Sequence, residues 1–296
     1  MIIVAFILLA LILSGFIFLF FVGPKMLLTP DRRQPEFYQK KFGFSDPSQL
    51  SLRRDDRFLV TDDGFKLSYW VLDDPACGKP KGAVIYLHGI TDSKVSGLNY
   101  AKYLAGFCQI VYLIDLRRHG ESEGNYCTYG YYEKHDVVKL IDRIAERHPG
   151  IGITLIGNSM GAAIAIQVAA IDSRVKGVMA IAPFYDLVTI ALDHEFRKIG
   201  IKSKVLLKFV LSRAERLADF HAADVSPARD MPKIKSRVLI VHGDEDKTVK
   251  KEYSLKLAGM NPNARLLTIK NAGHNDVLER GGETFLKEMR DFLESP

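Results

Sequence analysis

A serine between two glycines stands where one apolar run ends and an alanine-rich run begins. Residues 157–161 read Gly-Asn-Ser-Met-Gly, after the apolar residues 151–156 and before residues 162–170. Gly-x-Ser-x-Gly at a strand-to-helix switch is the nucleophile-elbow pattern, in which a tight turn lifts the serine hydroxyl clear of the sheet. The helix would direct its positive end at the reaction centre. The sequence predicts Ser159 as a nucleophile; the alternative is a serine in an ordinary turn.

A serine hydroxyl needs a base that accepts its proton, and His274 is the candidate. His274 follows the apolar residues 264–269 and precedes an amphipathic run at 276–293, so it is predicted in the loop between the last strand and the last helix. The base must stand in that loop to reach the serine. His194 and His221 fall in a predicted helical insertion, and His242 is predicted to be structural.

An acid must orient this base, and three carboxylates follow the apolar strand 237–241. We favour Asp246, because the loop must run out from the strand before it turns into a helix near Thr248. Asp244 and Glu245 lie closer to the strand end. The alternative is that all three are solvated loop charges, one of which caps the helix. In the predicted role, Asp246 accepts the imidazole N–H and stabilises the imidazolium without taking the proton.

Two backbone N–H groups are predicted to form the oxyanion hole. One is that of Met160, the residue after the nucleophile. The other is that of Ile90, because Gly89 lets the chain turn sharply after the strand at 83–87. Residues 115–122 carry many charges after another strand and are predicted to be scaffolding beside the site.

Strands and helices alternate from residue 83 to the end of the chain, after two strands at 58–61 and 65–72 joined by a hairpin turn. This order predicts an α/β fold, a mostly parallel sheet flanked by helices with an antiparallel start at one edge. Residues 184–231 interrupt the alternation and are predicted to form a small helical lid. We expect this domain to cover 57–296.

The motifs, in order, resemble those of the α/β-hydrolase superfamily of serine hydrolases, near the monoacylglycerol lipase and serine aminopeptidase-like group. The matching residues are His88-Gly89, Asp115 with residues 118–122, the Ser159 elbow, Asp246 and Gly273-His274. The family often has His where this chain has Asn158, and a second Gly where it has Ala162. The resemblance covers about residues 57–294 and implies hydrolysis of an ester, thioester or amide with no metal or organic cofactor.

Residues 2–22 carry no charge and are long enough, as a helix, to span roughly 30 Å of hydrocarbon. A signal peptide is the alternative, but no basic residue precedes the run and no Ala-x-Ala-like cleavage site follows it. The prediction is an uncleaved anchor at 1–23 and a basic polar connector at 24–56. Lys and Arg residues after the span place the domain in the cytoplasm by the positive-inside rule.

The chain has 296 residues, a net charge of +6 and three scattered cysteines. The cysteine count and spacing argue against a disulfide framework and a zinc site, and weakly favour a reducing compartment. The basic residues near the span fit lipid headgroups better than nucleic acid. The leading hypothesis is a membrane-anchored serine hydrolase acting on an acyl ester or lipid. An acyltransferase or a peptidase with the same triad, or a non-catalytic scaffold on this fold, remain alternatives.

Overall fold

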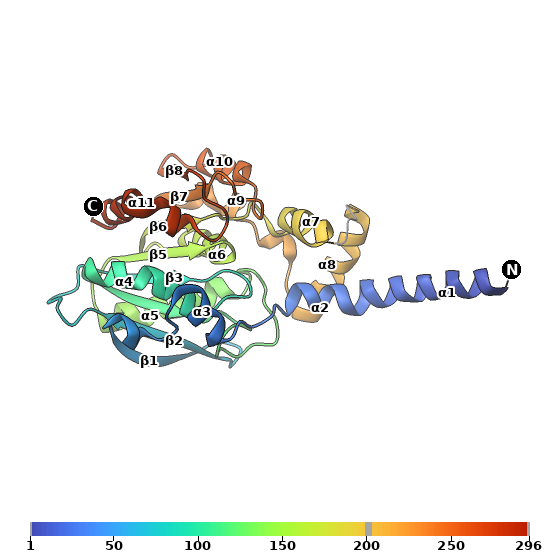
Figure 1. Cartoon of the computed structure of the whole chain (residues 1–296), viewed down its shortest axis with the longest axis horizontal. Helices are drawn as coiled ribbons and strands as arrows, with labels where there is room; N and C mark the ends of the chain where they lie inside the picture. The colour runs from blue at the N-terminus through green and yellow to red at the C-terminus, as the bar shows by residue number, and fades with distance from the viewer. Residues whose placement is uncertain (1, 199–202, 295–296) are drawn as a thin grey trace.

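One eight-stranded sheet forms the centre of the protein, which we describe from a computed structural model covering residues 2–198 and 203–294. The strand order is β1-β2-β4-β3-β5-β6-β7-β8 (Figure 1). Strand β2 is antiparallel to β1 and to β4, and all other pairs are parallel, which confirms the predicted antiparallel start at one edge. The strands are β1 Arg53–Val60, β2 Lys66–Asp73, β3 Gly82–Leu87, β4 Gln109–Ile114, β5 Ile153–Asn158, β6 Val175–Ile181, β7 Arg237–Gly243 and β8 Ala264–Ile269.

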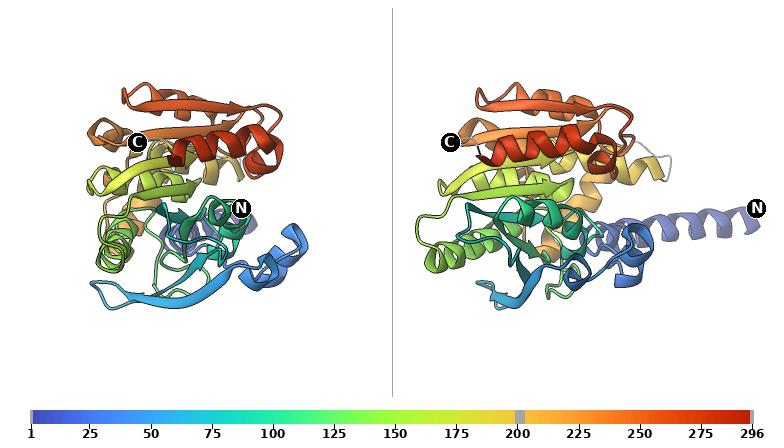
Figure 2. Two further views of the ribbon diagram at one scale, coloured as in Figure 1. Left: turned by 90° about the vertical axis from the view of Figure 1, so that its left-hand side faces the viewer. Right: turned by 60° about the vertical axis from the view of Figure 1, so that its left-hand side comes forward.

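Helices cover both faces of this sheet (Figure 2). One face packs against α5, α6 and α10, and the other against α3, α4 and α11. Strands β3 and β4 are buried along their whole length, as expected for strands covered on both sides. The bounds of these helices are α3 Pro35–Phe42, α4 Leu98–Gly106, α5 Glu133–Arg147, α6 Met160–Ala169, α10 Lys251–Ala258 and α11 Val277–Glu294.

The segment between β6 and β7 is helical, as the break in the alternation predicted. It holds α7 Leu187–Lys198, α8 Lys204–Ala218 and α9 Pro227–Asp230, with single helical turns η4 Ala222–Asp224 and η5 Met231–Lys233. Residues 199–202 of the predicted insertion lie outside the described residues, as does the side chain of His194. The insertion lies beyond the carboxyl ends of the strands, at the same end of the molecule as the N-terminal helix (Figure 1).

The N-terminal apolar run is one helical stretch from Ile2 to Leu28, long and apolar enough to cross a membrane. It comprises α1 Ile2–Ile17, a five-residue π-helical segment η1 Phe18–Val22 and α2 Gly23–Leu28. Helix α1 projects away from the domain (Figure 1). Its described side chains are exposed, so nothing in the domain covers this apolar surface.

The segment 24–56 differs from the expected polar connector, because it is packed into the domain. Leu28 and Tyr38 are buried, and β1 begins at Arg53, five residues before the predicted strand. Five consecutive charged residues, Arg53–Arg57, hid this strand, because their side chains form ion pairs on exposed faces, such as Arg57 with Asp55 at 2.7 Å. A further turn, η2 Pro47–Leu50, links α3 to β1.

The expectation of no disulfide is wrong. Cys77 and Cys108 are bonded to each other, and Cys127 is a buried free thiol. The two bonded cysteines lie in the loops before β3 and before β4, strands that are neighbours in the sheet. Their separation of 31 residues gave no motif in the sequence, because the pairing depends on sheet order.

Candidate active site

Ser159 stands at a sharp strand-to-helix turn between β5 and α6. Its backbone has φ 53° and ψ −112°, which is strained for a residue with a β-carbon. A β-carbon on Gly157 would lie 2.2 Å from the carbonyl oxygen of Gly161, and one on Gly161 would lie 2.0 Å from that of Leu87. Any side chain at either position would clash with the backbone, so both residues must be glycine. The turn has the geometry of the predicted elbow.

His274 meets Asp246 where the loops after β8 and β7 come together. The Nδ1 of His274 lies 2.7 Å from Oδ2 of Asp246, a contact that places a ring proton on Nδ1, so that the neutral tautomer carries its lone pair on Nε2. The N–H of Glu245 donates to Ala272 O at 2.9 Å and ties the two loops together. Within the loop after β8, the N–H of Gly273 donates to the Asp276 carboxylate at 2.6 Å. Both predicted residues are thus brought into one pair.

The side chain of Asp246 is fully buried and engaged by hydrogen bonds. Its Oδ1 accepts the backbone N–H groups of Thr248 at 2.7 Å and Val249 at 2.9 Å. Burial by itself would raise the pKa of Asp246, but hydrogen bonds from His242 and His274 outweigh it and hold the pKa well below its usual range. The carboxylate is therefore charged at neutral pH and can stabilise an imidazolium at His274.

The loop after β3 lies directly against the elbow. A β-carbon on Gly89 would lie 3.6 Å from that of Ser159. Among the described residues, no hydrogen bond uses the N–H of Ile90. Met160 is the first residue of α6, where a backbone N–H has no acceptor within its own helix. His88 accepts the N–H of Leu116 at 3.0 Å through Nε2 and so donates from Nδ1 to the carbonyl of Gly89 at 2.8 Å, which fixes the loop.

The charged stretch after β4 is held by its own polar contacts. The Lys94 ammonium lies 2.6 Å from Asp115 Oδ2, with both groups buried, and it also contacts Glu121 and Ser68. Asp115 also accepts the backbone N–H of Glu121 at 2.9 Å. A buried carboxylate with this many donors is a structural element of the fold.

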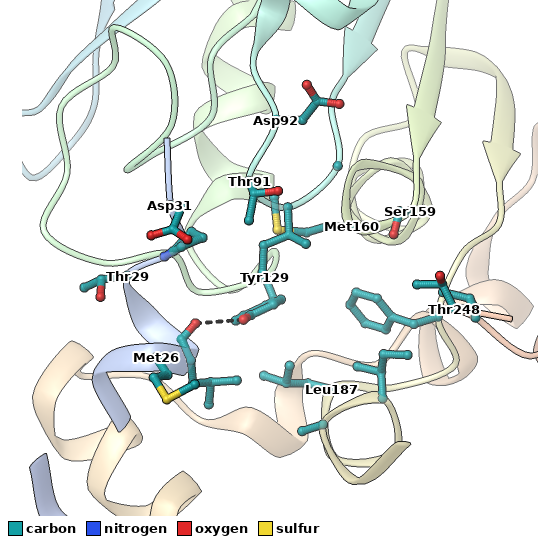
Figure 3. A pocket seen from close by; sticks show the side chains of 18 of the residues that line it. Met26, Thr29, Asp31, Thr91, Asp92, Tyr129, Ser159, Met160, Leu187 and Thr248 are labelled. Atoms are coloured by element: carbon teal, nitrogen blue, oxygen red, sulfur yellow. Dashed lines mark hydrogen bonds between the residues drawn. The ribbon is translucent and has the colours of Figure 1, made fainter. Parts of the chain in front are cut away.

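Ser159 and His274 line one cavity of about 660 Å³. Ile90 and Met160 line it too, as do Asp31, Thr248 and residues of α7. Figure 3 shows Met26 and Leu187 on one side of this cavity, with Ser159 and Thr91 across it. No hydrogen bond joins Ser159 to His274 in the part of the chain described; such bonds often tighten only when substrate is bound.

The sequence predictions missed two features of the site. The first is the contact of His242 with Asp246: His242 was predicted to be structural, and its Nε2 lies 3.3 Å from Oδ2 of Asp246. The second is the N-terminal helix, which contributes Phe21, Val22 and Met26 to the cavity. The only signal for the second was that an apolar run preceded a domain with a predicted apolar substrate.

Comparison with known proteins finds a family model and several relatives that this chain resembles. The family model described as "Serine aminopeptidase, S33" matches residues 78–224, which contain the loop after β3 and the elbow. The human monoglyceride lipase is 32% identical over 130 residues, 42% of this chain and 42% of that protein. The chain has the α/β-hydrolase fold. Its eight-stranded, mostly parallel sheet matches solved esterase structures, and its sequence is similar to lipases of this fold over about half its length.

Other relatives of this α/β-hydrolase extend the likeness beyond the matched model. The uncharacterized protein YqkD of Bacillus subtilis is 27% identical over 220 residues, 72% of this chain and 71% of that protein. The esterase Pf2001 of Pyrococcus furiosus has the same fold, with a TM-score of 0.70 at 24% identity, covering 90% of this chain and 97% of its own. The match to the mouse monoglyceride lipase spans half of that protein.

Proposed function

We propose that the protein is a membrane-anchored serine hydrolase that cleaves carboxylic esters or thioesters through an acyl-enzyme. Ser159 is the nucleophile and His274 is the general base. Asp246 orients the imidazole of His274 and stabilises the imidazolium that forms. The backbone N–H groups of Ile90 and Met160 form the oxyanion hole. The observation that supports this most is the His274–Asp246 hydrogen bond of 2.7 Å beside the cavity that Ser159 lines.

The reaction follows from these positions. The Ser159 hydroxyl adds to the substrate carbonyl while its proton passes to Nε2 of His274, and the negative oxygen accepts the two backbone N–H groups. The C–O or C–S bond to the leaving group then breaks, and His274 returns the proton to that group. Water, deprotonated by His274, adds to the acyl-enzyme, and the acid leaves as Ser159 regains its proton. Each oxyanion donor supplies roughly 3 kcal/mol of transition-state stabilisation.

The uncleaved anchor is part of the proposal. A signal sequence is the alternative that the helix alone permits, since it lies near the N-terminus. In this chain the helix runs on past the apolar run, and Gly23, Pro24, Leu27 and Leu28 are buried. Cleavage just after the apolar run would cut inside a helix whose end belongs to the packed domain, which favours retention.

The same residues could also pass the acyl group to an alcohol, as an acyltransferase does. One observation supports a peptidase as the second candidate. Asp31 and Asp92 line the cavity, and carboxylates can bind the ammonium of a peptide amino terminus. Asp92 is already engaged, since it accepts the hydroxyl of Tyr38 at 2.6 Å. The ester proposal therefore stays first, and turnover of amino-acid p-nitroanilides measures the peptidase alternative.

A fluorophosphonate probe tests the nucleophile directly. The account predicts covalent labelling of the detergent-solubilised wild type and none of Ser159→Ala. The control is Ser173→Ala, which removes an exposed serine outside the cavity and should label like the wild type. Labelling of Ser159→Ala at the wild-type rate, or no labelling of a folded wild type, would contradict the proposal and leave the scaffold alternative.

A further inference from the structure

The end of the N-terminal helix lines the catalytic cavity, in addition to joining the domain to the proposed membrane span. Phe21 and Val22, the last two residues of the uncharged run, lie on the same cavity as Ser159. Lys25 and Met26, one turn further, lie on it as well. The cavity is therefore bounded on one side by the very residues that would leave the bilayer.

This helix end is fixed to the domain. The hydroxyl of Tyr129 donates to the carbonyl of Leu27 at 2.7 Å, and the N–H of Cys127 donates to the carbonyl of Leu28 at 2.8 Å. At Gly23 the helix approaches α8 so closely that a β-carbon would lie 3.1 Å from Val210. No flexible linker intervenes, so the depth of the helix in a bilayer sets the depth of the cavity.

The length of the apolar run sets that depth. Residues 2–22 span roughly 30 Å as a helix, which matches the hydrocarbon core. Lys25 is the first charged residue after it and belongs at headgroup level. Because Val22 and Lys25 both line the cavity, its open side lies at the boundary between acyl chains and headgroups.

Helix α8 supports the same placement. It packs beside α2 and η1, at the end of the domain from which α1 projects (Figure 1). Val205 and Phe209 lie one turn apart on it and are 63% and 54% exposed, with exposed Lys204 and Lys208 beside them. Exposed apolar side chains flanked by lysines are typical of a helix that lies in a membrane interface.

The elements that line the cavity differ in polarity. The N-terminal helix and α7 contribute mostly apolar side chains, among them Phe21, Val22, Met26, Leu187, Ile190 and Ala191, with Lys25 as a charged exception at the helix end. The loops after α2 and β3 contribute the polar side chains of Thr29, Asp31, Arg33, Thr91 and Asp92, beside Pro30 and Ile90. In Figure 3, Met26 and Leu187 lie along the lower edge of the cavity, while Thr29 and Asp31 lie at its left. An acyl chain fits the first group and a hydroxylated headgroup fits the second.

We infer that the N-terminal helix forms part of the acyl-binding site, and that the substrate is an acyl-ester amphiphile that enters directly from the bilayer. This inference rests on the proposed hydrolase function and on the proposed anchor. Val22 and Met26 are then specificity-determining residues: with Phe21 they contact the acyl chain as it leaves the lipid, and residues before Phe21 do not.

Bulky substitution on the helix tests the inference. Val22→Trp narrows the cavity, and Ile17→Trp is the matched control: Ile17 is also β-branched, is 44% exposed against 42% for Val22, and does not line the cavity. Full-length protein is reconstituted in phosphatidylcholine vesicles and assayed with p-nitrophenyl palmitate in the vesicles and with soluble p-nitrophenyl acetate. The readout is the ratio of the two kcat/KM values.

The inference predicts that Val22→Trp lowers the palmitate-to-acetate ratio roughly tenfold or more, since pocket volume discriminates by such factors, while Ile17→Trp leaves it unchanged. Met26→Trp is the second variant and should act in the same direction. Equal ratios in Val22→Trp, Met26→Trp and Ile17→Trp would overturn the inference while the hydrolase proposal stands. Wild-type protein that hydrolyses neither ester, or Ser159→Ala that hydrolyses both, would overturn the proposed function as well.

Discussion

His242 Nε2 lies 3.3 Å from Oδ2 of Asp246, on the same oxygen that His274 contacts. The Nδ1 of His242 lies 2.7 Å from the hydroxyl of Ser254, and its Nε2 lies 3.1 Å from the carbonyl of Val249. A carbonyl can only accept, so the His242 proton sits on Nε2 and also faces Asp246. His242 is therefore a positioning residue, which holds the carboxylate that holds the catalytic base.

Removal of this donor should slow turnover without weakening substrate binding. We expect His242→Leu to lower kcat about tenfold or more with KM unchanged, since a hydrogen bond to a charged group contributes about 1.5–3 kcal/mol. His242→Gln, whose amide can place a donor near the Nε2 position, should recover most of kcat. Steady-state kinetics on a soluble ester measures both. Equal losses in the two variants would show that His242 only fills space.

The geometry of the elbow predicts that a single methyl group added at Gly161 strongly destabilises the protein. Gly161→Ala places a β-carbon against the carbonyl of Leu87, so the backbone must move, and we expect about 3 kcal/mol or more of lost stability and a fall in Tm of about 6 °C or more. The control is Gly106→Ala at the end of α4, where no atom lies within 4 Å. This variant should be neutral or slightly stabilising. Equal Tm values would contradict the described turn.

Stability should fall as the pH drops below neutrality. Burial lowers the pKa of His119 well below its ordinary value, and the ring's Nε2 has no hydrogen-bond partner in the described part of the chain. As the pH falls through about 6.5, the histidine of the unfolded chain binds a proton, whereas His119 in the folded chain stays neutral. The free energy of unfolding is therefore highest above that pH and decreases as the pH falls. One such ring loses about 1.4 kcal/mol by pH 5.5. Asp136 acts in the opposite sense, because burial raises its pKa to about 6.

Thermal unfolding from pH 7.5 to pH 5.5 measures this effect. His119→Asn can keep the donor that His119 Nδ1 presents to the carbonyl of Arg117 but cannot titrate. Its Tm should therefore decline less steeply with falling pH than that of the wild type. Parallel Tm curves for the two proteins would show that His119 does not titrate differently in the folded and unfolded states.

The disulfide and the basic residues point to opposite sides of a membrane. A Cys77–Cys108 bond is typical of an oxidising compartment, whereas Lys and Arg after the span predict a cytoplasmic domain. The charge rule is weaker for a folded domain. Protein denatured with N-ethylmaleimide should take up one label, at Cys127, and two more after reduction. Three labels without reduction would mean that the bond does not form where the protein resides, and would support the cytoplasmic prediction.

Local sequence pattern predicted the residues that the structure brings to the candidate site. Ser159 lies in a five-residue turn whose glycines are required by contacts within and beside that turn. His274 and Asp246 each follow a recognisable buried strand, and parallel strands bring their carboxyl ends to one edge. The parallel direction of most strands was predictable from the alternation of strands and helices, since each crossover helix returns the chain to the same direction.

Features that depend on distant contacts were not predictable. Cys77 and Cys108 meet because β3 and β4 are neighbours, which no spacing reveals. The N-terminal helix lines the cavity because Leu27 and Leu28 pack into the domain core, whereas its hydropathy indicated only a span. The charged strand β1 resembled a polar connector because its exposed ion pairs replace the usual apolar alternation.

Hydrolysis of a p-nitrophenyl ester series, from short to long chain, is the most direct test of the central claim. It compares the detergent-solubilised wild type with Ser159→Ala. The account predicts measurable turnover by the wild type, with a chain-length optimum set by the cavity. It predicts a loss of about 10⁴-fold or more in Ser159→Ala, as expected when the nucleophile is removed. Equal rates in the two proteins, or no turnover by either, would contradict the claim that this is a serine hydrolase of such esters.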